Sequence, residues 1–280
     1  MVGEKVAIVS DKPQTTRKRV LGVARGDGYE IALVDTPGIH RPEYRLNAAM
    51  VRDATDALAE ADLVLWIVDA SEKRGGGEEH IRRLIEKSGR PAVLALNKID
   101  RIAKPKLLPM LQEVSAWLDF PAIVPISALT GDGVDRLTGA LAENLPEGEA
   151  AYPEDFLTAT PESEWIGEII REKLLERTRE ELPFASAVVV ESVREDDAKN
   201  LTVVTASIVV EREGQKGIVI GAGGTMIREI GKAARAELEA ETGRKFFLEL
   251  TVKVRERWRD DERFLSRLVE DPGGKRKRPE

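Results

Sequence analysis

The sequence predicts an α/β domain with a mixed, mostly parallel sheet, followed by an α+β domain. From residue 63 to residue 145, strand-like apolar runs alternate with helix-like segments, a pattern typical of parallel strands joined by crossover helices. Beyond residue 160 the expected order becomes α-β-β-α-α-β-α. An acidic, proline-rich stretch without apolar periodicity separates the two patterns and indicates a linker. We therefore expect a first domain over residues 1–146, a linker over 147–160, a second domain over 161–272 and a basic tail over 273–280.

The composition is that of a globular protein without disulfides. A chain of 280 residues is long enough for about two domains, each with its own core. The absence of cysteine excludes a disulfide framework and a thiolate zinc site, and makes a reducing cytoplasm the expected location. No apolar run approaches the roughly 20 residues of a membrane span. The formal charge of -7 argues against bulk attraction to nucleic acid, so a nucleic-acid site must be local.

The first domain opens with a short apolar run. Residues 6–9 form at most a strand stub or a helix end, and a polar loop follows. Residues 19–24 and 29–34 are strand-like runs joined by a Gly-Asp-Gly turn, which predicts a β-hairpin. Residues 45–61 carry apolar residues at helical spacing.

Strands and helices then alternate to the end of the first domain. We expect strands at residues 63–68, 92–96 and 122–126, and helices after residue 77, after residue 105 and over residues 134–145. In sheets of this kind, ligands bind at the carboxyl ends of the strands. Asp35, Asn97 and Ser127 all fall at such ends and therefore predict a shared site.

The second domain is expected to begin with a helix over residues 164–179. Two strand-like runs follow, separated by a polar turn at residues 195–200. A short helix then leads to a glycine-rich loop and a longer helix on which Met226, Ile230 and Ala234 are aligned. The expected strands are residues 184–193, 201–210 and 246–254, the short helix is residues 215–220, and a last helix lies near residues 261–269.

The segment Asn97-Lys98-Ile99-Asp100 has the chemistry to recognise guanine. Guanine presents N–H donors at N1 and N2, and an ionised carboxylate such as Asp100 accepts both. Asn97 can bond N7, the Lys98 stem can cover the base plane, and the Ala128 N–H can donate to O6. A wrong base would leave the carboxylate unpaired at a cost of about 1–3 kcal/mol. The alternative for each motif alone is an ordinary charged turn, but their order along the chain favours a nucleotide site.

The segment Asp35-Thr36-Pro37-Gly38 can serve the phosphate end of the same ligand. A carboxylate there can hold Mg²⁺, and Gly38 lets backbone N–H approach a terminal phosphate. Upstream, two adjacent threonines lie in a loop before a strand. A threonine oxygen can complete a magnesium shell only when the third phosphate is present, as in a switch segment. The alternatives are an ordinary turn and a polar surface loop.

Together, residues 12–17, 35–40, 97–100 and 127–129 resemble the Era family of bacterial GTPases, and the glycine-rich loop at 221–224 resembles the KH module of that family. The resemblance covers the chain from about Gly3 to Trp258. It implies a P-loop-type GTPase fold followed by a type II KH domain, GTP or GDP with Mg²⁺ as ligands, and small-subunit ribosomal RNA as a partner in ribosome assembly. A peripheral contact with the cell membrane is sometimes described for the family. We expect a monomer that does not bind DNA.

Carried over residue by residue, the resemblance assigns candidate site residues. The candidate nucleotide-binding residues are Asp35, Thr36, Pro37, Gly38, Ile39, Asn97, Lys98, Asp100, Ser127, Ala128 and Leu129. The candidate switch residues are Gln14, Thr15, Thr16 and Arg17, and the candidate magnesium ligands are Thr16 and Asp35. The candidate RNA-binding residues are Lys216, Gly221, Ala222, Gly223, Gly224, Arg228 and Lys232.

The resemblance also implies GTP hydrolysis, although the catalytic residue is unknown. Ile39 stands where Ras-like proteins carry the glutamine that orients water, so slow hydrolysis or help from a partner is expected. His40 is a weak candidate base because no partner carboxylate is evident.

The glycine-rich loop can press its backbone against RNA phosphates and hold about four nucleotides. A plain helix-helix turn is the alternative. Ala222 replaces a residue that is commonly basic in the family, so weaker or less salt-sensitive binding is expected.

The sequence contains no G-x-x-x-x-G-K-[ST] motif. In the Era family this loop precedes the segment that residues 3–6 resemble. Each missing charge-assisted bond is worth about 1.5–3 kcal/mol, so we expect the chain as given to retain GTP poorly. The lost strand would also expose an apolar sheet edge. We favour a start assigned too far downstream over a true truncation. The alternative function is an RNA-binding KH protein with an inactive nucleotide domain.

Overall fold

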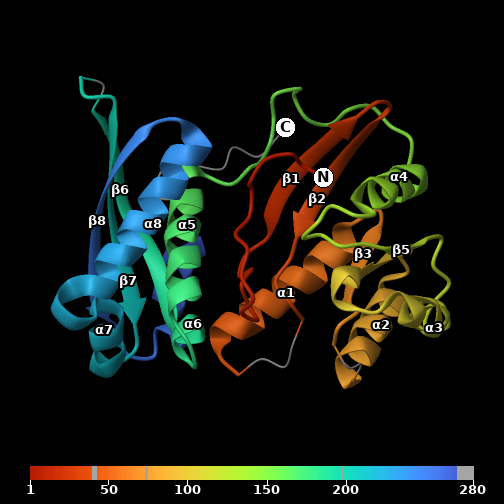
Figure 1. Cartoon of the computed structure of the whole chain (residues 1–280), viewed down its shortest axis with the longest axis horizontal. Helices are drawn as coiled ribbons and strands as arrows, with labels where there is room; N and C mark the ends of the chain where they lie inside the picture. The colour runs from red at the N-terminus through yellow and green to blue at the C-terminus, as the bar shows by residue number, and fades with distance from the viewer. Residues whose placement is uncertain (40–42, 73–74, 197, 270–280) are drawn as a thin grey trace. The chain divides into compact units, whose positions relative to one another are not determined.

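The structure is a computed structural model that describes residues 1–39, 43–72, 75–196 and 198–269. Its internal contacts divide the chain into two compact units (Figure 1). The first unit comprises Met1–Gly3, Leu21–Asp35 and Arg52–Thr158, and the second comprises Glu4–Val20, Thr36–Val51 and Ala159–Glu280. Two segments that precede residue 52 thus make their contacts with the second unit. The expected domain boundaries stay a prediction.

The first unit contains two sheets. A two-stranded sheet is formed by the hairpin, whose turn includes Gly28 at a positive φ of 77°. The other sheet is three-stranded and parallel in the order β3-β4-β5, as the alternation of strands and helices predicts. The strands are β1 (Val20–Gly26), β2 (Tyr29–Asp35), β3 (Val64–Asp69), β4 (Ala92–Asn97) and β5 (Ile123–Pro125), and the helices are α2 (Gly76–Ser88), α3 (Lys104–Ser115) and α4 (Val134–Asn144). Helix α1 (Arg45–Glu60) is divided between the units, with residues from Arg52 onward in the first.

Strand β4 is the centre of this unit because both of its faces are covered. Val93 and Ala95 belong to a core cluster that includes Leu137 of α4, whereas Leu94 and Leu96 belong to a second cluster with Ile85 of α2. This alternation follows from the two-residue period of a strand, and the uninterrupted apolar run is typical of a buried parallel strand. The core therefore fixes the carboxyl end of β4, where the candidate residues lie.

The second unit is built on a three-stranded sheet in the order β6-β7-β8, with β6 and β7 antiparallel and β7 and β8 parallel. Helices α5 and α8 lie side by side on one face of the sheet (Figure 1). The strands are β6 (Ser186–Asp196), β7 (Leu201–Val210) and β8 (Lys245–Val254), and the helices are α5 (Glu162–Arg177), α6 (Leu182–Ala185), α7 (Glu213–Ile220), α8 (Thr225–Thr242) and α9 (Glu262–Val269).

The predicted order of this unit is confirmed, with two local corrections. The strand expected from residue 184 begins at Ser186, because Leu182–Ala185 forms the short helix α6, with Pro183 in its first turn, where proline is tolerated. Residues 6–9, expected to form at most a strand stub or a helix end, form neither. Those residues are irregular: the Val9 N–H donates to Glu172 Oε1 at 2.7 Å, and Ile8 packs against the core.

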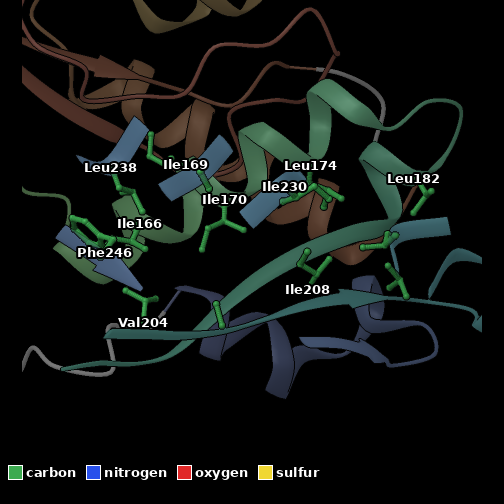
Figure 2. Packing of buried hydrophobic residues seen from close by; sticks show 14 residues of the cluster. Ile166, Ile169, Ile170, Leu174, Leu182, Val204, Ile208, Ile230, Leu238 and Phe246 are labelled. Carbon is green, nitrogen blue, oxygen red and sulfur yellow. The ribbon is translucent and has the colours of Figure 1, made fainter. Parts of the chain in front are cut away.

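The core of the second unit joins the two helices to the sheet. Figure 2 shows Ile166, Ile170 and Leu174 of α5 in the same cluster as Ile208 of β7 and Ile230 of α8. All five side chains are fully buried. At roughly 1.5–3 kcal/mol for each such side chain, this cluster makes a firm support for the glycine-rich loop between α7 and α8. Among the described residues, no helix is both long and apolar enough to cross a membrane.

Candidate functional site

Asn97 joins the loops that follow β4 and β5. Its Oδ1 accepts hydrogen bonds from the N–H of Lys98 at 2.7 Å and of Ala128 at 3.0 Å. The two predicted motifs are therefore brought together, since the carboxyl ends of neighbouring parallel strands meet at one edge. In this structure the Ala128 N–H, which we expected to donate to O6 of a base, donates to Asn97. Leu129 beyond it is 83% exposed.

Ser127 makes the β5 loop tight. Its side chain is buried, and its Oγ accepts the N–H of Thr130 at 3.2 Å. Its own N–H donates to the Asp132 carbonyl at 2.8 Å, and its carbonyl accepts the Gly131 N–H at 2.9 Å. The serine thus holds Ala128 and Leu129 in a defined turn at the edge of the site.

Asp100 presents an exposed carboxylate close to Asn97 in the sequence. It lies in a single 3-10 turn, Ile99–Arg101, that begins after Lys98 at a φ of 63°. The Ile99 N–H donates to the Ile126 carbonyl at 3.2 Å, which fixes this turn against the β5 loop. Within the described parts of the chain, no residue hydrogen-bonds to or ion-pairs with the Asp100 carboxylate, so both oxygens can accept donors from a ligand.

Asp69 is a site residue that sequence reasoning missed. It ends β3 and lies opposite Asn97 in the parallel register, and its Oδ2 is 2.5 Å from Lys98 Nζ. Burial alone would raise the pKa of Asp69, but hydrogen bonds from Lys98 and Ser71 outweigh burial and lower this pKa below its ordinary value. The available signal was its position, since Asp69 also ends an apolar strand.

Asp35 ends β2 in the first unit and is exposed. Four residues earlier, Ile31 is buried in the core cluster that contains Val93 of β4. The residues that follow, Thr36 to Ile39, are irregular and belong to the second unit, with Pro37 buried.

Magnesium fits the donors that this unit offers. Mg²⁺ in nucleotide sites is held by one or two carboxylates, with phosphate oxygens and water completing the shell. Among the described residues, no group of three or more His, Cys, Asp or Glu side chains could hold a metal alone. A single carboxylate such as Asp35 therefore suits an ion that arrives with a nucleotide.

The candidate switch segment is held by residues of the second unit. Gln14 Oε1 accepts a hydrogen bond from Asn47 Nδ2 at 3.1 Å, and the Thr15 hydroxyl donates to the Lys12 carbonyl at 2.6 Å. The Thr15 carbonyl accepts a hydrogen bond from Arg171. Thr16 is half-buried. This segment therefore belongs by its contacts to the second unit.

Arg17 is the last residue of this segment, and its guanidinium is surrounded by backbone carbonyl oxygens. It donates to the carbonyls of Ser186 at 2.7 Å and Pro183 at 3.0 Å, and its guanidinium lies 5.7 Å from the Trp258 ring centroid. Burial of the guanidinium, reinforced by the positive charge of Arg171, lowers the pKa of Arg17 to about 9. No sequence pattern indicates these partners, because they are backbone atoms.

The glycine-rich loop has the backbone that its glycines allow. Gly221 ends α7 at a φ of 72°, and a Cβ there would lie 2.8 Å from the backbone nitrogen of Met226. Gly223 and Gly224 also have positive φ. Arg228 donates to the carbonyls of Gly223 at 2.7 Å and Gly224 at 3.1 Å, so it braces the loop as well as supplying charge.

The other predicted RNA-binding residues lie in this loop or on the helices α7 and α8 that flank it. Ala222 is exposed, and Lys232 is exposed on α8. Lys216 is half-buried on α7 with its Nζ 3.8 Å from Glu213. His40 and the basic tail lie outside the described residues.

Comparison with known proteins agrees with this geometry. A family described as 50S ribosome-binding GTPase matches residues 1–98, and a family described as KH domain matches residues 181–259. The chain is 45% identical over 268 residues to the GTPase Era of Geobacter metallireducens, covering 96% of this chain and 90% of the relative.

Two solved structures have the same architecture. A variant of Era from Aquifex aeolicus bound to GDP and AlF4⁻ is 40% identical with a TM-score of 0.91, covering 95% of this chain and 91% of that one. A structure of Era with MgGDPNP and nucleotides 1506–1542 of 16S ribosomal RNA is also 40% identical with a TM-score of 0.91, covering 95% and 90%. The predicted fold class, a GTPase fold followed by a KH domain, is confirmed. The chain belongs to the Era family of GTPases.

Proposed function

We propose that this chain is a guanine-nucleotide-dependent RNA-binding protein that acts in assembly of the small ribosomal subunit. The observation that carries the proposal is at Asn97. Its side chain bonds the loops after β4 and β5, and the nearby Asp100 carboxylate has no partner among the described residues. At this edge the loops are held by Asn97, and the two oxygens of the Asp100 carboxylate can accept the two N–H donors of guanine.

In this proposal each part of the nucleotide has its own residues. Asp100 accepts the N1 and N2 donors of guanine, and the stem of Lys98 covers the base. The Ser127 loop, with Ala128 and Leu129, borders the base. Asp35 holds Mg²⁺. Thr16 as a second magnesium ligand, and Thr36, Pro37, Gly38 and Ile39 at the terminal phosphate, stay predictions from the sequence. Mg²⁺ would offset the charge of the phosphates, and hydrolysis of GTP would release the switch segment.

RNA is proposed to bind at the glycine-rich loop. Gly221, Ala222, Gly223 and Gly224 would approach phosphates through their backbone, with Lys216 and Lys232 adding charge. The loop is braced by Arg228 and sits on a buried core, which supports a preformed site. The related structure with nucleotides 1506–1542 of 16S ribosomal RNA supports ribosomal RNA as the partner class.

The proposed location is the cytoplasm. A chain without cysteine suits this reducing compartment, and the proposed RNA partner is found there. A peripheral contact with the membrane and the monomeric state stay predictions from the sequence.

Two titrations test the proposal. GDP and ADP are titrated into the whole chain with Mg²⁺ by calorimetry, and a fluorescent transcript of nucleotides 1506–1542 of 16S ribosomal RNA is titrated in parallel. We expect GDP to bind at least about tenfold more tightly than ADP, because adenine cannot satisfy Asp100. RNA affinity should fall as salt rises. Equal affinity for GDP and ADP would contradict the nucleotide site.

One sequence observation favours a second candidate. The chain contains no G-x-x-x-x-G-K-[ST] motif, which suits an RNA-binding KH protein whose nucleotide domain is inactive. The same titrations separate the two candidates. RNA binding without any binding of GDP at millimolar concentration would favour the second.

A further inference from the structure

Two strand ends of the first unit are tied together by an ion pair outside the recognised motifs. Asp69 and Asn97 face each other in the parallel register of β3 and β4, and Lys98 Nζ lies 2.5 Å from Asp69 Oδ2. The other carboxylate oxygen accepts the Ser71 N–H at 2.8 Å and the Ser71 hydroxyl at 2.6 Å. Because both oxygens have partners, the carboxylate has a fixed orientation. Its side chain is only 18% exposed.

Among the described residues, the ammonium of Lys98 has one polar partner, Asp69. The Lys98 backbone lies in the left-handed region at a φ of 63°, and its N–H donates to Asn97. Holding a lysine side chain in one conformation costs rotamer entropy. The charge-assisted bond to Asp69 offsets that cost before any ligand arrives.

We propose that Asp69 is a positioning residue for the guanine site. It holds the ammonium of Lys98 so that the alkyl stem keeps one conformation beside Asn97 before a base binds. A side chain that is already ordered adds no ordering cost to binding, so the pair raises nucleotide affinity without touching the nucleotide. This inference rests on the proposed function, because Lys98 has a base to cover only if these loops bind guanine.

Substitutions can separate the positioning role of Asp69 from a purely structural role, in which Asp69 would only cap the turn at Ser71. Asp69→Asn keeps the size of the side chain and an oxygen for Ser71, but it removes the charge that holds Lys98. Ser71→Ala removes one bond to Asp69 and leaves the ion pair. Lys98→Met keeps an apolar stem and removes the ammonium. Asp62→Asn is the matched control, since Asp62 is exposed just before β3, at the opposite end of that strand.

The experiment is a double-mutant cycle on GDP affinity, measured by calorimetry on the whole chain with Mg²⁺. We expect Asp69→Asn to raise the GDP Kd about tenfold, and Ser71→Ala and Asp62→Asn to change it less than about twofold. In the Lys98→Met background, Asp69→Asn should have no further effect, because the group that Asp69 holds is gone. An unchanged Kd in Asp69→Asn, or independent effects that multiply in the double variant, would overturn the proposal.

A second measurement needs no nucleotide. The amino group of Lys98 is acylated with an N-hydroxysuccinimide ester, and its labelling rate is read by peptide mass spectrometry. Asp69→Asn should raise this rate about threefold or more, whereas Asp62→Asn should leave it unchanged. A chain that binds no GDP would overturn the proposed function and the positioning role together. A chain that binds GDP, but whose Asp69→Asn variant binds and labels like the wild type, would overturn the positioning role alone.

Discussion

Arg17 donates a hydrogen bond to the carbonyl oxygen of Ser186 at 2.7 Å, across 169 residues of sequence. Ser186 is the first residue of β6, in the three-stranded sheet of the second unit. Arg17 belongs to the candidate switch segment. The relationship means that a movement of this segment would break hydrogen bonds within the second unit. We therefore expect the local stability of β6 to depend on the nucleotide state.

The first prediction concerns Arg17→Lys. A lysine cannot reproduce the planar fork that reaches the carbonyls of Ser186 and Pro183, so local stability should fall by about 1–3 kcal/mol. Hydrogen exchange of the amides in residues 14–19 and in β6 measures this loss. Arg52→Lys, at an exposed position on α1, is the control. Amide hydrogen exchange that is the same in Arg17→Lys and in the control would contradict a stabilising role for these hydrogen bonds.

The second prediction concerns acid stability through Glu237 on α8. Its carboxylate pairs with Lys5 and lies 2.5 Å from Lys173 Nζ. Burial would raise the pKa of Glu237, but the bonds from Lys173 and Lys5 outweigh burial and lower it. The charged form is therefore favoured by folding. This contribution is present above the unfolded pKa of about 4.3 and is lost as the pH falls through the lowered folded pKa.

The corresponding experiment compares urea midpoints at neutral and acidic pH. Glu237→Gln should lower the midpoint at pH about 7 and lose less stability than the wild type on acidification to pH about 3. Glu241→Gln, at an exposed position on the same helix, should follow the wild type at both values. Parallel behaviour of the wild type and Glu237→Gln would show that the cluster does not contribute.

The third prediction concerns the glycine-rich loop. Gly221→Ala should lower both the melting temperature and RNA affinity, because a Cβ at a φ of 72° would press on Met226. Gly214→Ala is the control, since nothing lies within 4 Å of a Cβ there and α7 begins at the preceding residue. Alanine in a helix is favoured over glycine by about 1 kcal/mol, so this variant should be at least as stable as the wild type. Equal RNA affinity in the two variants would argue against the loop as the binding site.

The site at Asn97 could be predicted from the sequence because it follows from a general rule about parallel sheets. Parallel strands end together, so residues that follow consecutive strands converge, and the bond from Ala128 to Asn97 is the outcome. The alternation of β4 between two cores was also predictable, since it follows from an apolar run of five residues between β3 and β5.

Other features could not be predicted because their partners carry no sequence signal. Arg17 binds backbone carbonyls of α6 and β6, and any residue type has a carbonyl. The helix α6 is only four residues long, too short for an apolar period. The ion pair between Asp69 and Lys98 can be predicted only when the register of β3 and β4 is known. Arg171 Nη1 and Ser186 Oγ are buried without a partner among the described residues, a detail of packing that no motif encodes.

The central claim is that Asp100 selects guanine, and exchanging its carboxylate for an amide tests this claim most directly. Calorimetry would compare GDP with xanthosine diphosphate, which presents a carbonyl oxygen where guanine has its N2 amino group. Asp100→Asn can donate an N–H to that oxygen but can no longer accept two donors from guanine. Asp119→Asn, at an exposed position before β5, is the control. We predict that Asp100→Asn lowers GDP affinity by about tenfold or more and reverses the preference toward xanthosine diphosphate. An unchanged preference for GDP in this variant would contradict the account.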